Sequence, residues 1–230
     1  MKSQMFRIML AMLFAGALAL QAPAQNKTTE VKFRGAYYDQ RRAAHDLEGI
    51  PEGSVVFLGN SITEQGWWSM LFKTKNIVNR GIGGDNAYGM LDRLPDILKA
   101  KPSKMFLMCG INDISLKIPN DTIVANIRKM VRMTKCMAPQ CSLYIESVLP
   151  INETRLVYTT VKGDNPTVDE LNLKLRSMCK EEGVGFVDIA SLLKDEKGEL
   201  RLSLTKDGLH LHPEAYLIWA KEFKRLKLLK

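Results

Sequence analysis

The sequence predicts an α/β protein in which helices cover both faces of a parallel sheet. Five short apolar runs recur along the chain, and stretches with helical spacing of apolar residues separate them. Strands that are apolar at nearly every position and alternate with helices are typical of parallel sheets buried on both sides. The length of 230 residues suits one domain with a sizeable core.

Each predicted element follows from a local pattern. Apolar runs predict strands over 54–58, 77–79, 104–109, 142–149 and 185–189. Apolar residues three and four apart predict helices over 37–49 and 86–98, and further helices around 123–134, 168–178 and 216–226. Pro95 is expected to bend or end its helix. The longest irregular stretch, 150–166, is mostly polar, and loops of this length are uncommon unless they have a function.

The first 24 residues are interpreted as an export signal. Two basic residues precede an apolar run over 8–20, and Ala22-Pro23-Ala24 gives the small-x-small pattern that signal peptidase reads. The run is shorter than the ~20 apolar residues that a membrane-spanning helix needs. We therefore expect cleavage near Ala24, a single mature domain over 25–230, and an exported protein, periplasmic or secreted, without stable membrane insertion.

The charge distribution argues against a nucleic-acid partner. Lysine and arginine number 33 against 25 acidic residues, but they are scattered among the acids. A nucleic-acid surface needs a basic stripe with interleaved aromatics. The densest basic cluster, at 221–230, instead alternates with apolar residues as the end of an amphipathic helix does.

The four cysteines and one isolated histidine are interpreted as structural. Cys109 lies in an apolar run and Cys179 on an amphipathic helix, so both are expected in the core. A four-residue turn separates Cys136 from Cys141, and the spacing leaves open whether the two form a disulfide. His45 lies among charged residues of the first predicted helix and is expected at the surface or rim.

The end of the first strand raises the main functional question. In "FLGNSITEQ" an apolar strand stops at Ser61, which together with Glu64 fits a capping box. The alternative is a nucleophilic serine, because open α/β sheets place their chemistry at the carboxyl ends of strands. Taken alone, the pattern fits a helix cap at least as well as a nucleophile.

Three further loops at the same predicted edge supply the other parts of a hydrolytic site. They are "NRGIGGDN" (79–86), "GIND" (110–113) and "DGLHLHP" (207–213). A hydroxyl nucleophile needs a base, a carboxylate that orients the base, and hydrogen-bond donors for the oxyanion. His210, Asp207, the Gly84 N–H and the Asn112 amide offer these parts to Ser61.

Together the four motifs resemble the GDSL-type, or SGNH, hydrolases, especially the branch of platelet-activating-factor acetylhydrolase and bacterial acetylesterases. The resemblance covers roughly residues 37–219. It implies Ser61 as nucleophile, Asp207 and His210 as its partners, and Ser61, Gly84 and Asn112 as oxyanion donors. It also implies a three-layer flavodoxin-like sandwich, a five-stranded parallel sheet in the order 2-1-3-4-5, and no metal or other cofactor.

Two positions qualify this picture, and three others are candidates for substrate contact. Asn60 stands where the family usually has Asp, which alters the local charge and hydrogen bonding, and His212 is a second candidate base. Trp67, Trp68 and Asn152 are candidate substrate-binding residues, the tryptophans through stacking of a sugar ring.

These features predict a serine esterase that removes acetyl or other short acyl groups from a small-molecule or glycan ester, with carbohydrate favoured. A long acyl chain needs an apolar channel or lid, whereas the 150–166 loop is mostly polar. One alternative is a lysophospholipase or thioesterase. Others are a metal-dependent phosphoesterase built on Asp85, Asn112, Asp113 and the two late histidines, and a glycan- or flavin-binding module without activity.

Overall fold

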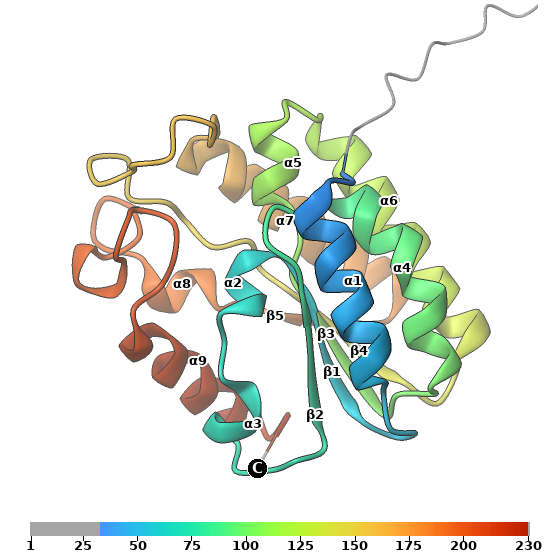
Figure 1. Cartoon of the computed structure of the whole chain (residues 1–230). Coiled ribbons are helices and arrows are strands. Elements are labelled where there is room, and N and C mark those ends of the chain that lie inside the picture. Colours follow the sequence, from blue (N-terminus) through green and yellow to red (C-terminus); the bar gives the residue numbers. More distant parts are fainter. Residues whose placement is uncertain (1–32, 230) are drawn as a thin grey trace, which may run out of the picture. The chain divides into compact units, whose positions relative to one another are not determined.

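The computed structural model describes residues 33–229, which form a five-stranded sheet between two layers of helices (Figure 1). The strands are β1 (Val55–Gly59), β2 (Ile77–Gly81), β3 (Lys104–Leu107), β4 (Ser142–Glu146) and β5 (Gly185–Val187). All neighbouring pairs are parallel, and the order is β2-β1-β3-β4-β5. The predicted fold class and strand order are confirmed. The predicted signal segment, 1–24, lies outside the described residues.

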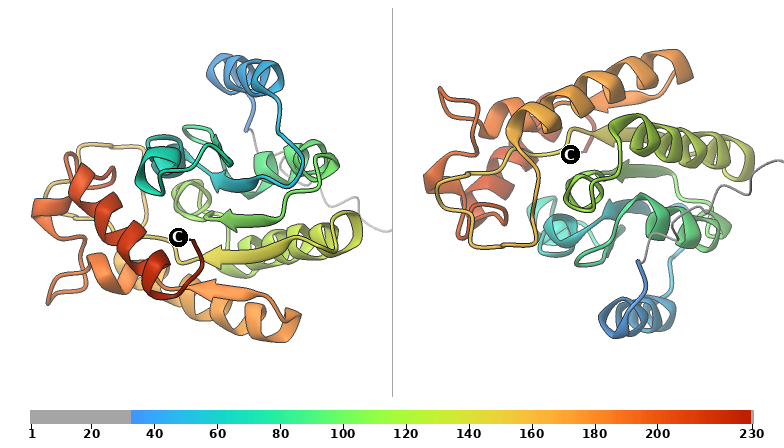
Figure 2. Two further views of the ribbon diagram at one scale, coloured as in Figure 1. Left: turned by 90° about the horizontal axis from the view of Figure 1, so that it is seen from below. Right: turned by 90° about the horizontal axis from the view of Figure 1, so that it is seen from above.

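Helices cover both faces of the sheet (Figure 2). One face carries α4 (Ala87–Lys99), α6 (Asn120–Met137) and α7 (Asn165–Glu182), and the other carries α3 (Trp68–Leu71), α8 (Ala190–Leu193) and α9 (Pro213–Arg225). The helix α1 (Ala36–Glu48) lies beside α4, where the Tyr38 hydroxyl donates to Gly89 O (3.1 Å). Pro95 does not end its helix, because α4 continues past it to Lys99.

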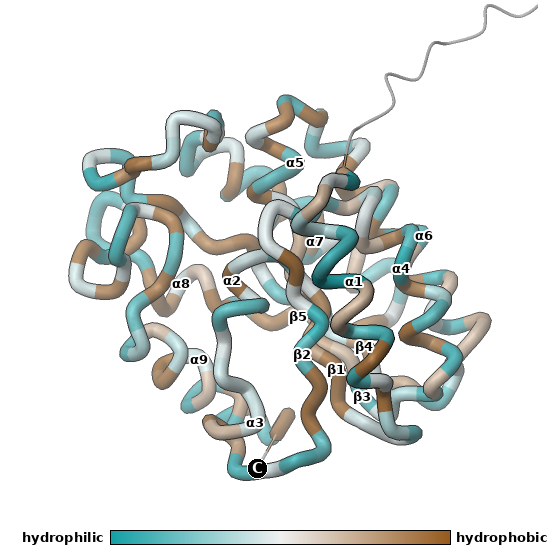
Figure 3. Tube along the Cα trace, in the orientation of Figure 1, coloured by the Kyte–Doolittle hydropathy of each residue, from teal (hydrophilic) through white to brown (hydrophobic). Residues whose placement is uncertain are grey.

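A layer of stacked aromatic rings fixes α3 and α9 to the sheet. Phe57 on β1 stacks on Trp68 with ring centroids 4.1 Å apart, and Phe223 on α9 lies 5.9 Å from Phe57. Figure 3 shows the hydropathy of each residue along the chain, with hydrophobic residues concentrated in the strands and hydrophilic ones on the helices and loops around them. Trp68 Nε1 also donates to Thr63 O (2.9 Å), so this core supports the turn that follows β1.

The cysteines are all free thiols, including the pair that the sequence left open. Cys109 and Cys179 are buried in the core as predicted, each 1% exposed. Cys136 is exposed and does not bond to Cys141.

The prediction that His45 lies at the surface is wrong, because its side chain is buried. It is on the same face of α1 as Tyr38, and this face packs inward. Burial and the nearby guanidinium of Arg80 lower the pKa of His45 to about 3, so the ring is neutral at pH 7. Neighbouring charged residues in the sequence had suggested a solvated position. Instead, Arg41 pairs with Glu64 of the segment after β1, Arg42 pairs with Asp96 of α4, and Glu48 pairs with Arg80 of β2.

One buried carboxyl group lies at the carboxyl end of β4. Trp219 Nε1 donates to Glu146 Oε1 (2.8 Å), while Oε2 has no hydrogen-bond partner within residues 33–229. Burial raises the pKa of Glu146 to about 8. The side chain is therefore mainly protonated at neutral pH, which avoids an uncompensated charge beneath α9.

This carboxyl group predicts a stability that falls as the pH rises. The folded state keeps the proton up to about pH 8, whereas the unfolded chain releases it near 4.5. The contribution of Glu146 to the free energy of unfolding is therefore complete below pH 4.5. It decreases between pH 4.5 and about 8, by at most about 1.4 kcal/mol per pH unit. In Glu146→Gln, which is neutral at every pH, denaturant unfolding should show that this loss is absent. Exposed Glu196 supplies the control, Glu196→Gln, and parallel pH curves for wild type and Glu146→Gln would contradict the prediction.

Candidate active site

Ser61 is the first residue of the short helix α2 (Ser61–Glu64), directly after β1. The residue that caps this helix is Asn60, whose Oδ1 accepts from the N–H of Ile62 (3.0 Å). The capping-box interpretation of Ser61 and Glu64 is therefore wrong, and the serine hydroxyl is free for other contacts. The cap also gives Asn60 a physical role, because an amide oxygen accepts this bond as an Asp carboxylate does.

Two glycines let α2 lie directly over the ends of β1 and β2. A Cβ atom at Gly59 would lie 2.0 Å from Thr63 Oγ1, and one at Gly81 would lie 2.1 Å from the Glu64 nitrogen. These positions therefore exclude any larger residue unless α2 moves. Because α2 packs closely on the strand ends, the position of Ser61 relative to the sheet is fixed.

The three residues predicted as a catalytic set are joined by hydrogen bonds. His210 Nε2 lies 2.9 Å from Ser61 Oγ, and His210 Nδ1 lies 2.8 Å from Asp207 Oδ2. The Asp207 Oδ1 atom accepts from the N–H groups of Leu209 (3.0 Å) and His210 (2.6 Å). Burial by itself raises the pKa of Asp207, but the hydrogen bonds from His210 and Leu209 together outweigh it and hold the pKa below its ordinary value. The carboxylate therefore stays charged and orients the imidazole.

The second candidate base, His212, occupies a different position. It is the N-cap residue of α9, and its own N–H donates to Leu204 O (2.8 Å). Of the two histidines, His210 is the one whose ring lies within hydrogen-bond distance of Ser61.

The predicted oxyanion donors lie on two neighbouring loops. Gly84 has φ of +76°, a conformation that strains any residue with a side chain, and its N–H has no acceptor within residues 33–229. Asn112, in α5 (Ile111–Ser115), donates one Nδ2 hydrogen to Asp85 O (2.8 Å), which leaves the second for a ligand. The Ser61 N–H is in the first turn of α2 and has no partner inside that helix.

The buried ion pair that Arg93 and Asp85 form beneath these loops was not predicted from the sequence. Arg93 on α4 pairs with Asp85 (2.8 Å) and donates to Gly59 O (3.0 Å) and Arg80 O (2.6 Å). Burial raises the pKa of Asp85, and Arg93 counteracts this. The available signal was an arginine on the apolar face of a predicted helix, beside Met90 and Leu94.

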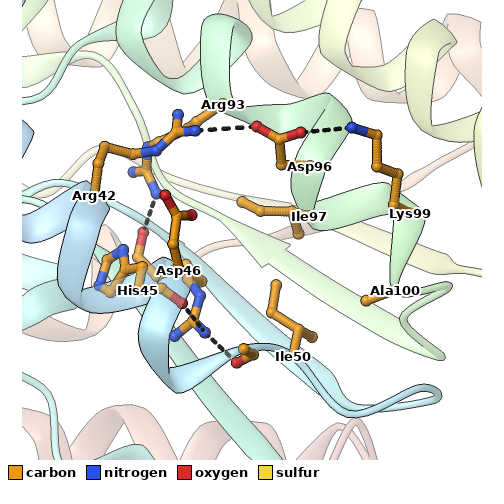
Figure 4. Close-up of a pocket in the computed structure, with 11 residues that line it drawn as sticks. Arg42, His45, Asp46, Ile50, Arg93, Asp96, Ile97, Lys99 and Ala100 are labelled. Carbon is orange, nitrogen blue, oxygen red and sulfur yellow. Dashed lines mark hydrogen bonds and ion pairs between the residues drawn. The ribbon is translucent and has the colours of Figure 1, made fainter.

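A cavity of about 550 Å³ lies between α1 and α4, away from the predicted site residues (Figure 4). Most of its charged groups already have ion-pair partners: Asp96 binds both Arg42 (3.0 Å) and Lys99 (2.8 Å). At its inner wall Arg80 binds Glu48 (2.8 Å) and the carbonyl of Gly49 (2.5 Å). These contacts make the cavity wall a structural support for β2.

The three candidate substrate contacts differ in exposure. Trp68 belongs to the core, at 1% exposed, so it offers no ring face to a ligand. Asn152 is also buried, and its amide bonds to Leu200 O (2.9 Å) and to the Arg155 N–H (3.0 Å). Trp67, 53% exposed and next to Tyr216, is the one that presents an aromatic surface.

Tyr158 is a residue beside the predicted base that sequence reasoning missed. It lies on the long loop between β4 and α7, with its ring 5.2 Å from the His210 ring at 75°. The side chain is 41% exposed and so forms part of the accessible wall of the site. The available signal was a single aromatic residue in a mostly polar loop.

Comparison with known proteins identifies the class. Residues 57–218 match the GDSL-like lipase/acylhydrolase family, and because this is well over half of the sequence, the chain belongs to that family. The structure is similar to a GDSL-like lipase from Bacteroides thetaiotaomicron, with 26% identity, a TM-score of 0.70, and coverage of 84% of this chain and 98% of that one.

Two further similarities differ in what they cover. A catalytic mutant of an acetylxylan esterase from Geobacillus stearothermophilus has 20% identity and a TM-score of 0.61, over 79% of this chain and 97% of that one. An N-acylneuraminate cytidylyltransferase from Streptococcus agalactiae is 27% identical over 184 residues, or 76% of this chain. The chain spans only 40% of that relative's length.

The described residues hold neither a metal-binding cluster nor a membrane-spanning helix. Within 33–229 there is no group of three or more His, Cys, Asp or Glu side chains arranged to hold a metal ion. Asp113, one of the residues of the phosphoesterase alternative, instead accepts from the Ala87 N–H (3.0 Å), and burial raises its pKa to about 7. No helix in this part of the chain is long and apolar enough to cross a membrane.

The buried ion pair gives a testable expectation for stability. Arg93→Met leaves the Asp85 carboxylate without its counter-charge in the interior, which typically costs ~3–5 kcal/mol. Arg42→Met breaks a pair of partly exposed side chains on the same helix layer, and should cost ~0–1 kcal/mol. Urea unfolding of both variants measures the difference. Equal decreases in the free energy of unfolding for the two variants would show that the buried Arg93 pair contributes no more than the exposed Arg42 pair.

Proposed function

We propose that this protein is an exported serine esterase that removes acetyl or other short acyl groups from carbohydrate. The observation that carries the proposal is the continuous hydrogen-bonded line from Ser61 through His210 to Asp207. Family membership as a GDSL-like acylhydrolase supports ester hydrolysis. Export rests on the signal pattern in residues 1–24.

The proposed mechanism assigns one role to each group. Ser61 Oγ attacks the ester carbonyl while His210 Nε2 takes its proton, and Asp207 holds the Nδ1–H and stabilises the imidazolium. Donors at Gly84 and Asn112, with the Ser61 N–H, bind the oxyanion. The tetrahedral intermediate collapses to an acyl-enzyme, and the leaving alkoxide takes the proton from His210. Water then repeats the sequence, releasing the carboxylic acid and restoring the serine.

The preference for carbohydrate rests on the residues around the serine. The loop between β4 and α7 is polar along most of its length, which suits a hydroxyl-rich leaving group, and it carries Tyr158 beside His210. Trp67 offers a second exposed ring next to α2. The distant neighbour from Geobacillus acts on acetylxylan, but at 20% identity that likeness concerns the fold.

Three alternatives differ in a readily measured property. A lysophospholipase or thioesterase hydrolyses long-chain esters in preference to acetylated sugars. A metal-dependent phosphoesterase loses activity with EDTA and regains it with a divalent ion, whereas the proposed esterase is insensitive to EDTA. A binding module without activity does not react with serine-directed fluorophosphonates.

Substitution of the proposed catalytic residues tests the mechanism directly. Ser61→Ala and His210→Ala should each lower kcat on p-nitrophenyl acetate by ~10⁴-fold or more, because each removes a group that forms or breaks a bond. Asn112→Ala should cost ~10²–10³-fold, as loss of one oxyanion donor does. His212→Ala is the matched control and should stay within about tenfold of wild type. Near-ultraviolet circular dichroism verifies that each variant is folded. Full activity of Ser61→Ala would refute the mechanism.

A series of acyl chain lengths tests the substrate class. We expect kcat/KM for p-nitrophenyl esters to fall steeply beyond about four acyl carbons, because overfilling a packed acyl pocket costs ~1–3 kcal/mol. The same assay should include acetylated glycans and a lysophospholipid. A maximum at about eight carbons or more, on the same reasoning about pocket volume, would favour the lipid alternative. So would hydrolysis of the lysophospholipid with no acetylated glycan cleaved.

A further inference from the structure

The loop between β4 and α7 packs directly on the turn that carries Asp207 and His210. Asn152 N donates to Gly208 O (2.8 Å), and Val157 N donates to Asp207 O (3.1 Å). A Cβ atom at Gly208 would lie 2.5 Å from the Leu156 nitrogen, so the two segments are in close contact. The backbone of residues 152–158 is therefore held at a fixed position relative to the turn that carries Asp207 and His210.

A cavity of about 710 Å³ opens beside this pair of segments. One wall comes from the loop, from Asn152 to Arg155, and another from Lys206 and His212 on either side of the turn. Lys206 directly precedes Asp207, and its Nζ donates to the side chain of Gln65 (2.8 Å), the residue after α2. The volume lies in the range of ~300–1,000 Å³ that is usual for ligand sites.

Arg155 in this cavity is unlike the other arginines. Among residues 33–229 it is the one arginine whose guanidinium has no recorded ion pair, hydrogen bond or aromatic contact. Nine of the others pair with carboxylates, and Arg201 donates to a backbone carbonyl. A guanidinium offers a planar fork of donors that matches a carboxylate with two parallel bonds. Arg155 thus presents an unused carboxylate-binding group to the cavity.

The other charges of the cavity leave an excess of positive charge. Lys197 and Lys206 line it as well, and neither has a carboxylate partner within the described residues. Two carboxylates, Asp195 and Glu199, also line it. Asp195 Oδ1 already accepts from the N–H groups of Lys197 (2.9 Å) and Glu199 (3.0 Å), which closes its own turn. The cavity thus has three cationic side chains and two carboxylates, and one of the carboxylates already accepts hydrogen bonds from its own turn. This excess of positive charge favours an anionic ligand.

Building on the proposed esterase function, we infer that this cavity is a subsite for the carboxylate of an acidic sugar in the leaving-group part of the substrate, and that Arg155 determines this specificity. The distance from Arg155 to His210 suits an oligosaccharide. Arg155 and Tyr158 are three residues apart, so their Cα atoms are at most ~11 Å apart, and the Tyr158 ring lies 5.2 Å from the His210 ring. An oligosaccharide covers this distance, whereas a small acetate ester does not.

Two substrates that differ only in one charged group test the inference. Acetylated xylooligosaccharides with and without a glucuronate side group have the same backbone and the same acetyl esters. Wild type should release acetate from the acidic form with about tenfold higher kcat/KM, the contribution of one charge-assisted hydrogen-bonded pair. In Arg155→Ala this preference should disappear, mainly through KM, while hydrolysis of the neutral form and of p-nitrophenyl acetate stays unchanged. Arg155→Lys should keep part of the preference.

The matched control is Lys162→Ala, which removes one positive charge from the same loop but lines a different cavity. It should keep the full preference for the acidic substrate. Equal rates on the two substrates for wild type, or the same loss in Lys162→Ala as in Arg155→Ala, would overturn the subsite. If wild type fails to hydrolyse p-nitrophenyl acetate, the proposed function fails. Calorimetric titration of the glucuronate-bearing oligosaccharide into wild type and Arg155→Ala then tests the subsite separately, and equal affinities overturn it.

Discussion

The guanidinium of Arg93 bonds at once to the Asp85 carboxylate and to the carbonyls of Gly59 and Arg80. These three groups belong to the end of β1, the end of β2 and the glycine loop, so one buried side chain sets their spacing. The carbonyl of Asp85 in turn accepts from the amide of Asn112. Because the Arg93 and Asp85 side chains are buried, these bonds hold the turn that carries Ser61 and the loops that carry Gly84 and Asn112 in fixed positions relative to one another.

A second set of contacts, made by Glu64, supports the glycine loop at the edge of the sheet. Glu64, at the end of α2, accepts from the Gly83 N–H (2.7 Å) and from the Tyr37 hydroxyl (2.7 Å), and it also pairs with Arg41 (2.7 Å). The helix α1 therefore braces the glycine loop as well as covering the rim. The contacts of Arg93 and Glu64 thus hold the segments that carry Ser61, Gly84 and Asn112 in place without a bound substrate. Electrostatic catalysis of the proposed kind needs such preorganised donors.

The sequence predicted the features that depend on local pattern, and missed those that depend on tertiary contact. Apolar runs located all five strands, and four loop motifs indicated the family. The role of Ser61 as a cap was wrong, because Asn60 one residue earlier takes that position once α2 forms. Burial of His45 and the bonds of Arg93 depend on how α1 and α4 pack on β2, and no spacing within either helix specifies these partners.

The two sides of the site are held by different kinds of interaction. Buried charges fix the loops that carry Gly84 and Asn112, whereas the loop between β4 and α7 is attached to the Asp207–His210 turn by main-chain bonds from Asn152 and Val157. Main-chain bonds do not depend on the side chains between their ends. Exposed residues such as Arg155 and Tyr158 can therefore differ between sequences while the His210 imidazole keeps its place. In the proposed esterase, this separation allows the exposed loop to match different esters without a change in the geometry of Ser61, His210 and Asp207.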